Sequence, residues 1–517
     1  MEATAISHGR YAGAVAAGHP MTVNAARDIL KAGGNAFDAA LGAMCMATVA
    51  EPVLASFGGG GFLLARPVNS PAKLFDFFAQ TPKRGPVPGA RDFYPVVADF
   101  GPAQQEFHIG LGSMAVPGVV DGLFHVHDAL GHMPLERLIE PALEAARDGY
   151  EVSPFQAYLF SVVGPIYMIS DAARCIFACP GDPGRLIGEG DHFRNLDAAD
   201  FLDALVREGP RLFYEGEIAN RIAEDCRDGL GTLSREDLAS YRTVEREPLA
   251  VDVADTQVFT NPLPSTGGVL VAFALKLLEG TMGLDGTWGT ADHALALLRA
   301  MAVTEEARNR TALSQLLGCE NLSAYRQALA SHPQARRGTT HISIIDGDDN
   351  ACALTLSNGE GAGYVIPGTG VMMNNMLGEE DINPQGLDSW PLDVRMGSMM
   401  APTIIEQPGR LMVLGTGGSN RIRTAILQVI LNLTAFSMTV EEAVSAPRFH
   451  LEQGCLDVEP GWPERAVQAL RAEIPDTRIW PDRNLFFGGV HAVTAGPDLQ
   501  QAAGDPRRAG AAAIIGR

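Results

Sequence analysis

The 517-residue sequence predicts an α+β protein in which helices and strands alternate along the chain. Helix-capping and helix-stopping residues recur through the first half, and two apolar runs joined by a polar turn form a hairpin pattern near residue 340. No Ser- or Pro-rich linker, block of charge or internal repeat divides the chain. The length therefore fits one large domain as well as several.

The first helices are predicted from their end signals. Residues 24–31 are expected to form a helix that stops at Gly33 and Gly34. Asn35 is expected to cap a second helix that runs to about Ala50.

Two later helices carry weaker signals. Pro134 suits the first turn of a helix that ends before Gly149, although Pro141 inside it conflicts with regular helix geometry. Ser234 with Asp237 three residues later resembles a capping box. These helices are expected to be scaffold.

The hairpin consists of strand-like runs at 341–345 and 351–356, joined by the turn 346–350. The turn has oxygen-bearing residues at alternate positions, as a calcium loop does. The match fails because Ala351 replaces the glycine of the sharp bend and Ser357 replaces the terminal glutamate. We therefore expect a solvated turn and no metal site.

Thr339 and Thr340 stand at the mouth of this hairpin. A threonine hydroxyl is a weak nucleophile that needs an adjacent base. If the chain were cut after Gly338, the freed α-amino group of Thr339, with a pKa of about 8, would be that base. These residues alone fit a plain strand edge better, since β-branched residues favour strands.

Further motifs surround the threonines in a fixed order along the chain. They lie at residues 28–40, 58–62, 262–268, 338–341, 370, 374–375, 401–403, 415–419, 446–450 and 505–507. In this order and together, they resemble the γ-glutamyltransferase family of N-terminal nucleophile hydrolases. The resemblance implies a four-layer αββα sandwich with two antiparallel sheets between helical layers.

The resemblance also implies self-cleavage between Gly338 and Thr339. The products would be a large segment, 1–338, and a small segment, 339–517, which together form one intertwined domain. Thr339 would then attack a substrate amide and form an acyl-enzyme that water or an amine resolves.

Other catalytic positions follow from the resemblance. Gly417 and Gly418 would form the oxyanion hole, where glycine lets the backbone approach closely. Ser357 falls where the family has a hydroxyl residue that supports the nucleophile. A strand-end serine in a turn is an equally good interpretation of Ser357.

The largest departure from the family concerns the acyl group. Phe78 stands where γ-glutamyl enzymes have an arginine that binds the α-carboxylate, and a phenyl ring offers no charge-assisted hydrogen bond. Lys83 or Arg84 could replace it or could simply be solvated. Arg395 and Arg421 are open as structural ions or as anion contacts.

The remaining substrate positions implied by the resemblance are Asn375, Glu379, Glu380, Ser398 and Met399. Glu379 or Glu380 could keep the family's contact with the substrate amine. The family commonly has paired serines where this chain has Ser398 followed by Met399, so one hydroxyl is missing.

Composition excludes several classes of partner. The net charge of −22 disfavours nucleic acid, which binds clustered Lys and Arg. Apolar residues form 46% of the chain without an uninterrupted run of about 20, so we expect no membrane span. The glycine run 58–61 lacks the residues of a nucleotide loop, and no cofactor is expected.

Seven scattered cysteines disfavour a disulfide framework. The early acid at Glu2 favours a cytoplasmic location.

The sequence thus predicts an autoprocessing amidohydrolase like γ-glutamyltransferase or glutathione hydrolase. Its partners would be a small amide or γ-glutamyl substrate and the two fragments of one precursor, with further homo-oligomer formation left open. One alternative is an acylase for a non-glutamyl, glutaryl-type group. Another is an uncleaved, inactive relative that binds a small ligand, although such a protein needs neither Thr339 nor Gly417 and Gly418.

Overall fold

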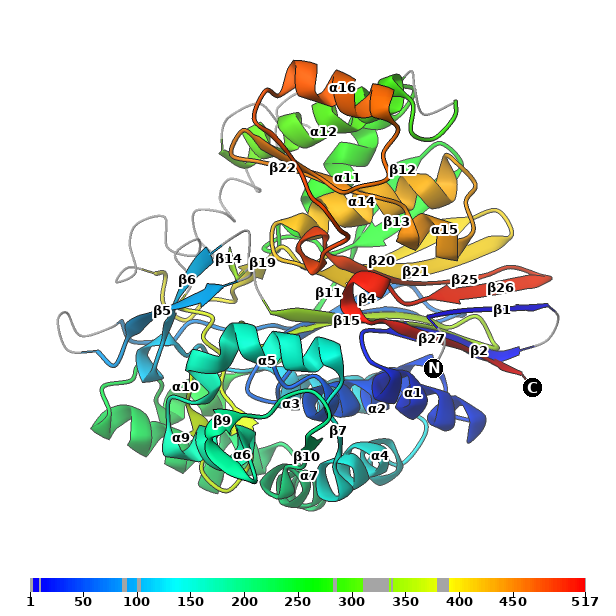
Figure 1. The fold of residues 1–517 in the computed structure, drawn as a ribbon. Helices are drawn as coiled ribbons and strands as arrows, with labels where there is room; N and C mark the ends of the chain where they lie inside the picture. Colours follow the sequence, from blue (N-terminus) through cyan, green and yellow to red (C-terminus); the bar gives the residue numbers. More distant parts are fainter. Residues whose placement is uncertain are drawn as a thin grey trace.

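The computed structural model of the chain describes residues 3–8, 11–85, 91–99, 104–281, 286–309, 334–335, 338–378 and 390–516. Two seven-stranded antiparallel sheets pack face to face, and helices cover both outer faces (Figure 1). The predicted four-layer αββα sandwich is confirmed.

Each sheet combines strands from both sides of residue 338. Sheet I has the order β1 (Thr4–His8), β26 (Leu499–Ala503), β25 (Gly489–Ala495), β21 (Arg410–Gly417), β20 (Thr403–Gln407), β13 (Thr256–Thr260) and β12 (Leu249–Val253). Sheet II has the order β11 (Val244–Arg246), β4 (Lys73–Phe77), β3 (Gly60–Arg66), β16 (Ala351–Ser357), β15 (Thr339–Asp346), β2 (Tyr11–Ala17) and β27 (Ala511–Gly516). The strands before and after residue 338 are therefore interleaved.

Two helical layers enclose the sheets (Figure 1). Over sheet I lie α11 (Gly267–Leu278), α14 (Arg421–Thr434) and α15 (Val440–Ser445), with α12 (Ala291–Asn309) and α16 (Glu464–Glu473) further out. Under sheet II lie α1 (Pro20–Lys31), α2 (Ala36–Ala50), α3 (Val119–Leu130), α4 (Leu135–Asp148) and α7 (Leu196–Glu208). Because α2 packs on both β15 and α4, its residues are nearly all buried.

Smaller elements complete the chain. The helices are α5 (Pro154–Tyr167), α6 (Asp171–Phe177), α8 (Arg211–Tyr214), α9 (Glu217–Asp228), α10 (Arg235–Ser240), η1 (Leu111–Ser113), η4 (Leu485–Phe487) and η5 (Pro506–Arg508). The strands are β5 (Tyr94–Asp99), β6 (Gln104–Ile109), β7 (Tyr150–Glu151), β8 (Ala178–Cys179), β9 (Asp182–Leu186), β10 (His192–Phe193), β14 (Gln334–Ala335), β17 (Val365–Ile366), β18 (Val371–Met372), β19 (Gly397–Ser398), β22 (Phe449–Glu452), β23 (Cys455–Val458) and β24 (Thr477–Ile479).

The helix ends follow the local signals closely. The helix predicted over 24–31 ends as expected but begins at Pro20, because the His19 side chain accepts a hydrogen bond from the Met21 amide at 3.2 Å. Asn35 caps α2 through the amides of Phe37 and Asp38, as predicted.

The weaker helix signals are also confirmed. The helix α4 begins directly after Pro134 and ends before Gly149, and it accommodates Pro141. Ser234 and Asp237 form the predicted capping box at the start of α10.

The hairpin extends further than predicted, so that Thr339 is the first residue of β15. Its turn is not uniformly solvated, which corrects the prediction. Asp346 is 4% exposed, and its carboxylate accepts hydrogen bonds from the amides of Asp348, Asn350 and Ala36. The aspartate therefore ties the turn to the start of α2.

In the described ranges, no helix has the length and apolar character that crossing a membrane requires.

Candidate active site

Thr339 lies between the two sheets at one end of the sandwich. It pairs across the strands with Ser357, which in turn pairs with Gly60, and it is 2% exposed. Alternate residues of a strand share a face. Ser343, four residues along β15, donates to the His491 carbonyl on sheet I at 2.9 Å, so the Thr339 side chain also faces sheet I.

The carbonyl of Gly338 is held by Ser357. The Ser357 hydroxyl donates a hydrogen bond to this carbonyl at 2.6 Å. Gly338 has a φ of +46°, and a Cβ atom there would lie 1.5 Å from the Gly359 carbonyl oxygen. Only glycine fits this conformation and this space. The peptide bond before Thr339 is thus fixed next to a hydroxyl donor.

The end of β21 lies directly against Thr339. A Cβ atom on Gly417 would lie 2.0 Å from the Thr339 carbonyl oxygen, and Gly418 has a φ of +129°. Both positions therefore require glycine.

Thr416 orients the Gly417–Gly418 peptide. Its hydroxyl donates to the Gly417 carbonyl at 2.6 Å and accepts from the Gly489 amide at 2.7 Å. Because a trans peptide is planar, its N–H points away from its carbonyl. Within the part of the chain that the structure describes, the Gly418 N–H makes no hydrogen bond. It is a donor available to an oxyanion beside Thr339.

Arg508 reaches Thr339 from the C-terminal end of the chain. Its Nη1 donates to the Thr339 carbonyl at 2.9 Å, and its side chain is buried. Among the described residues no carboxylate forms an ion pair with it. Burial, together with the nearby charge of Arg421, lowers the pKa of Arg508 to about 10.

A buried ion cluster holds the segment that carries Arg508. Arg448 donates to Asp505 at 2.7 Å, and Arg507 donates to Glu459 at 2.6 Å and to Asp505 at 3.2 Å. Burial raises the pKa of Asp505, but the two arginines outweigh it and lower the pKa to about 2.

Thr340 points to the opposite face of sheet II. Its hydroxyl donates to Glu51 at 2.7 Å, and the other oxygen of this carboxylate accepts from Thr22 at 2.8 Å. Burial raises the pKa of Glu51, while the two hydroxyl donors and the charge of Arg508 act against the rise.

Phe78 belongs to the core. Its ring is fully buried and stacks on Phe62 with ring centroids 5.2 Å apart. Arg395 donates to the Phe78 carbonyl at 2.6 Å and lies 3.7 Å from Asp76, so Arg395 is a structural ion. Lys83 donates to Glu236 at 3.2 Å.

The other predicted substrate positions lie in packed surroundings. The Asn375 side chain accepts from the Glu360 amide at 2.8 Å and thereby supports the turn after Ser357. Ser398 and Met399 are buried against the loop 262–268. Glu379 and Glu380 lie outside the described residues.

Arg421 begins α14 and donates to the Phe486 carbonyl at 3.0 Å, with its guanidinium over the Phe486 ring.

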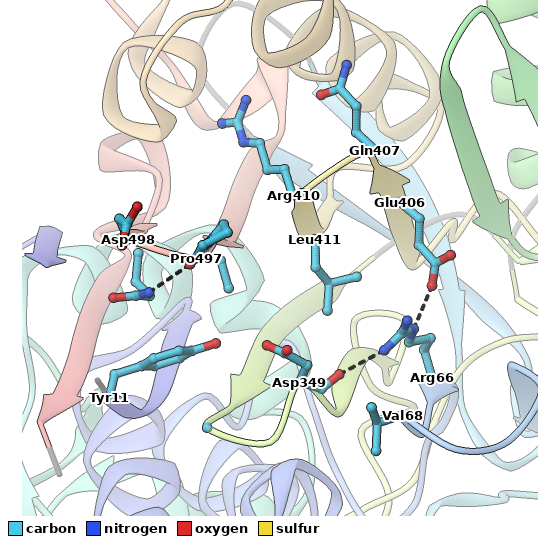
Figure 2. A pocket seen from close by; sticks show the side chains of 15 residues that line it. Tyr11, Arg66, Val68, Asp349, Glu406, Gln407, Arg410, Leu411, Pro497 and Asp498 are labelled. Atoms are coloured by element: carbon cyan, nitrogen blue, oxygen red, sulfur yellow. Dashed lines mark hydrogen bonds and ion pairs between the residues drawn. The ribbon is translucent and has the colours of Figure 1, made fainter. Parts of the chain in front are cut away.

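A separate hollow of about 840 Å³ lies at the other end of the sandwich (Figure 2). Strand turns line it, and Arg66 contacts Glu406 there at 2.5 Å. Asp349, in the hairpin turn, also lines it, whereas Thr339 begins β15 roughly 20 Å away along the strand. Thr339 does not line this hollow.

The structure thus brings Gly338, Thr339, Ser357, Gly417 and Gly418 together. Sequence reasoning did not identify Thr416, Arg508 or Glu51 as site residues. Thr416 lies inside the motif at 415–419, and Arg508 directly follows the motif at 505–507. No regular spacing along the sequence connects Glu51 with Thr340.

A threonine at the head of a central strand in a four-layer αββα sandwich defines the class of N-terminal nucleophile hydrolases. The model of the γ-glutamyltranspeptidase family matches residues 22–515. The chain belongs to this family and is an enzyme.

Several relatives support the assignment. A glutathione hydrolase proenzyme of Escherichia coli (strain K12) is 30% identical, over 93% of this chain and 88% of the relative. An acylase ACY 1 proenzyme of Pseudomonas sp. (strain V22) is also 30% identical, over 94% of this chain and 90% of the relative. The crystal structure of a cephalosporin acylase from Bacillus halodurans superimposes with a TM-score of 0.78 at 25% identity, over 98% of this chain and 96% of that chain. Glutathione hydrolases and acylases are thus equally similar to this chain.

Proposed function

We propose that the chain cleaves itself between Gly338 and Thr339 and then uses Thr339 as the nucleophile of an amidohydrolase. The observation that carries this proposal is the Ser357 hydroxyl, 2.6 Å from the Gly338 carbonyl, beside a threonine fixed at the head of β15. A hydroxyl that donates to a carbonyl stabilises the negative charge that develops there during attack.

Maturation begins when the Thr339 hydroxyl attacks the Gly338 carbonyl carbon. The Gly338–Thr339 amide bond breaks, an ester to the Thr339 Oγ forms, and the released nitrogen takes the hydroxyl proton. Water then hydrolyses the ester and leaves segments 1–338 and 339–517. The interleaved strands hold the two segments together.

Turnover uses the new α-amino group as the base. It accepts the Thr339 Oγ proton while the oxygen attacks a substrate amide, and the Gly418 N–H donates to the tetrahedral oxyanion. The ammonium then protonates the leaving amine. Water or another amine attacks the acyl-enzyme and regenerates Thr339.

The proposed substrate class is a small amide or γ-glutamyl compound, as in glutathione hydrolases. A second candidate is an acylase that accepts a non-glutamyl, glutaryl-type group. Phe78, buried in the core where the family has its carboxylate-binding arginine, favours an acylase for an acyl group without that carboxylate. A glutaryl group keeps the carboxylate, so Phe78 does not by itself favour glutaryl over γ-glutamyl substrates.

The intact mass of the purified protein tests the nucleophile. We expect two fragments, the smaller beginning at Thr339, and we expect Thr339→Ala to abolish scission and turnover. Thr434→Ala, on α14, is the matched control and should be cut normally. A wild-type chain that stays whole after prolonged incubation would overturn the proposal.

A panel of chromogenic anilides tests the acyl group. Comparable or faster release from glutaryl than from γ-glutamyl anilide would support the acylase. A strong γ-glutamyl preference would instead assign the glutathione hydrolase activity. The cytoplasmic location stays a prediction, which cell fractionation can test.

A further inference from the structure

Two buried ionisable side chains, one acidic and one basic, hold consecutive residues at the head of β15. Arg508 donates to the Thr339 carbonyl at 2.9 Å, and Glu51 accepts from the Thr340 hydroxyl at 2.7 Å. Both side chains are more than nine-tenths buried. The mechanism proposed above uses neither group.

The head of β15 needs such anchors once the chain is cut. β2 pairs with β15 only from Ile342 onward, so Thr339 and Thr340 pair with β16 alone. Cleavage would make Thr339 a chain terminus, and termini that are not tied down become poorly ordered.

The position of Glu51 is energetically unfavourable for an ionised carboxylate. It follows the last residue of α2, where the helix dipole places partial negative charge, and it is withdrawn from water. The chain leaves room for it at Gly18, where a Cβ atom would lie 2.6 Å from the Glu51 carboxylate and 2.8 Å from the Thr340 hydroxyl.

We propose that Glu51 and Arg508 are positioning residues that fix the cleaved end of β15 and set the protonation of its new α-amino group from opposite directions. This inference rests on the proposed function, because it requires Thr339 to become a terminus.

For Arg508, the contact geometry bounds the distance to the new amine. The nitrogen and carbonyl oxygen of one residue are at most about 3.6 Å apart, so Arg508 Nη1 lies within about 6.5 Å of the Thr339 nitrogen. A cation nearby favours the neutral amine, which is the active base, and an anion favours the ammonium.

Other charged or titratable groups face this pair. Arg421, Asp505 and His491 interact with Arg508, and Tyr150 interacts with Glu51. All four remain in place in the variants below, so their influence is common to every measurement.

The experiment compares the pH dependence of kcat/KM for the wild type, Glu51→Gln and Arg508→Gln in the full chain, after intact mass has shown cleavage. In Glu51→Gln the acidic group is lost. Because the ionised form of this group favours the ammonium, the pKa of the amine should fall and the acid limb should move to lower pH by about 0.5–1 unit. In Arg508→Gln the cation is lost, and the acid limb should move to higher pH by a similar amount.

Glu464→Gln and Arg465→Gln on the exposed start of α16 are the matched charge controls and should leave the limb unmoved. If only one of the two test variants is cleaved, the shift of its acid limb alone tests the inference. Unmoved limbs, or shifts in the same direction, would overturn the inference while leaving the proposed function intact. Failure of both test variants to be cut, with both controls cut, would also overturn it, since the pair would then act before a terminus exists. An uncut wild type would instead overturn the proposed function and, with it, this inference.

Discussion

At the scale of single residues, the site depends on contacts between atoms that are close in space and distant in sequence. Ser357 donates to the Gly338 carbonyl, and Thr416 donates to the Gly417 carbonyl and so fixes the orientation of the Gly417–Gly418 peptide. Phe78 stands where the family has an arginine, and its aromatic ring lies in the core. In the proposed function, the chemistry of attack and the choice of acyl group therefore depend on different residues.

Ser357→Ala should slow self-cleavage by about 100-fold, because removing one oxyanion donor typically costs 10²–10³ in rate. A gel time course of the purified precursor measures the rate. Ser357→Thr, which keeps the hydroxyl, should retain most of it. Equal rates for the alanine variant and the wild type would show that the 2.6 Å hydrogen bond has no role in scission.

At the scale of elements, short capping signals determine where the helices begin and end. Asn35 caps α2, the helix that packs beneath β15 and ends at Ala50, directly before Glu51. The cap therefore stabilises the helix that packs against β15, the strand that carries Thr340. The predicted start of α1 at residue 24 lies four residues after the observed start at Pro20, because histidine is an uncommon N-cap and gives a weak sequence signal.

Asn35→Ala should lower the free energy of unfolding by about 1–2 kcal/mol, since the amides of Phe37 and Asp38 lose their acceptor. Thermal or urea unfolding measures the change. Asn220→Ala, inside α9, is the control and should have a smaller effect. An unchanged midpoint for Asn35→Ala would contradict a stabilising cap.

At the scale of the whole molecule, strands from both sides of residue 338 share each sheet, and a buried ion cluster holds the C-terminal segment. Asp505 accepts from Arg448 and from the Val490 amide of β25, and this links the C-terminal segment to sheet I. The segment carries Arg508 to Thr339.

Asp505→Asn should destabilise the fold by about 3–5 kcal/mol, because it leaves buried arginines without their counter-charge. The folded-state pKa of Asp505, about 2, lies below its ordinary value of 3.8. The carboxylate's contribution is therefore complete above about pH 4 and is lost as the pH falls toward 2.

Unfolding midpoints of the wild type and Asp505→Asn, measured between pH 7 and pH 2.5, should converge as the pH falls. Asp203→Asn breaks an exposed ion pair with Arg207 and should cost no more than about 1 kcal/mol. A constant difference between the wild type and Asp505→Asn across this range would contradict the assignment.

Taken by itself, the sequence determined the helix caps, the hairpin, the expected cut before Thr339 and the family resemblance. These features are local, because a cap, a turn or a motif is encoded within a few neighbouring residues. Only the tertiary structure decided that Arg508 and Glu51 meet Thr339 and Thr340 from 169 and 289 residues away, and that Phe78 lies in the core. Contacts of this kind depend on how strands from both halves of the chain interleave, which no spacing along the sequence specifies.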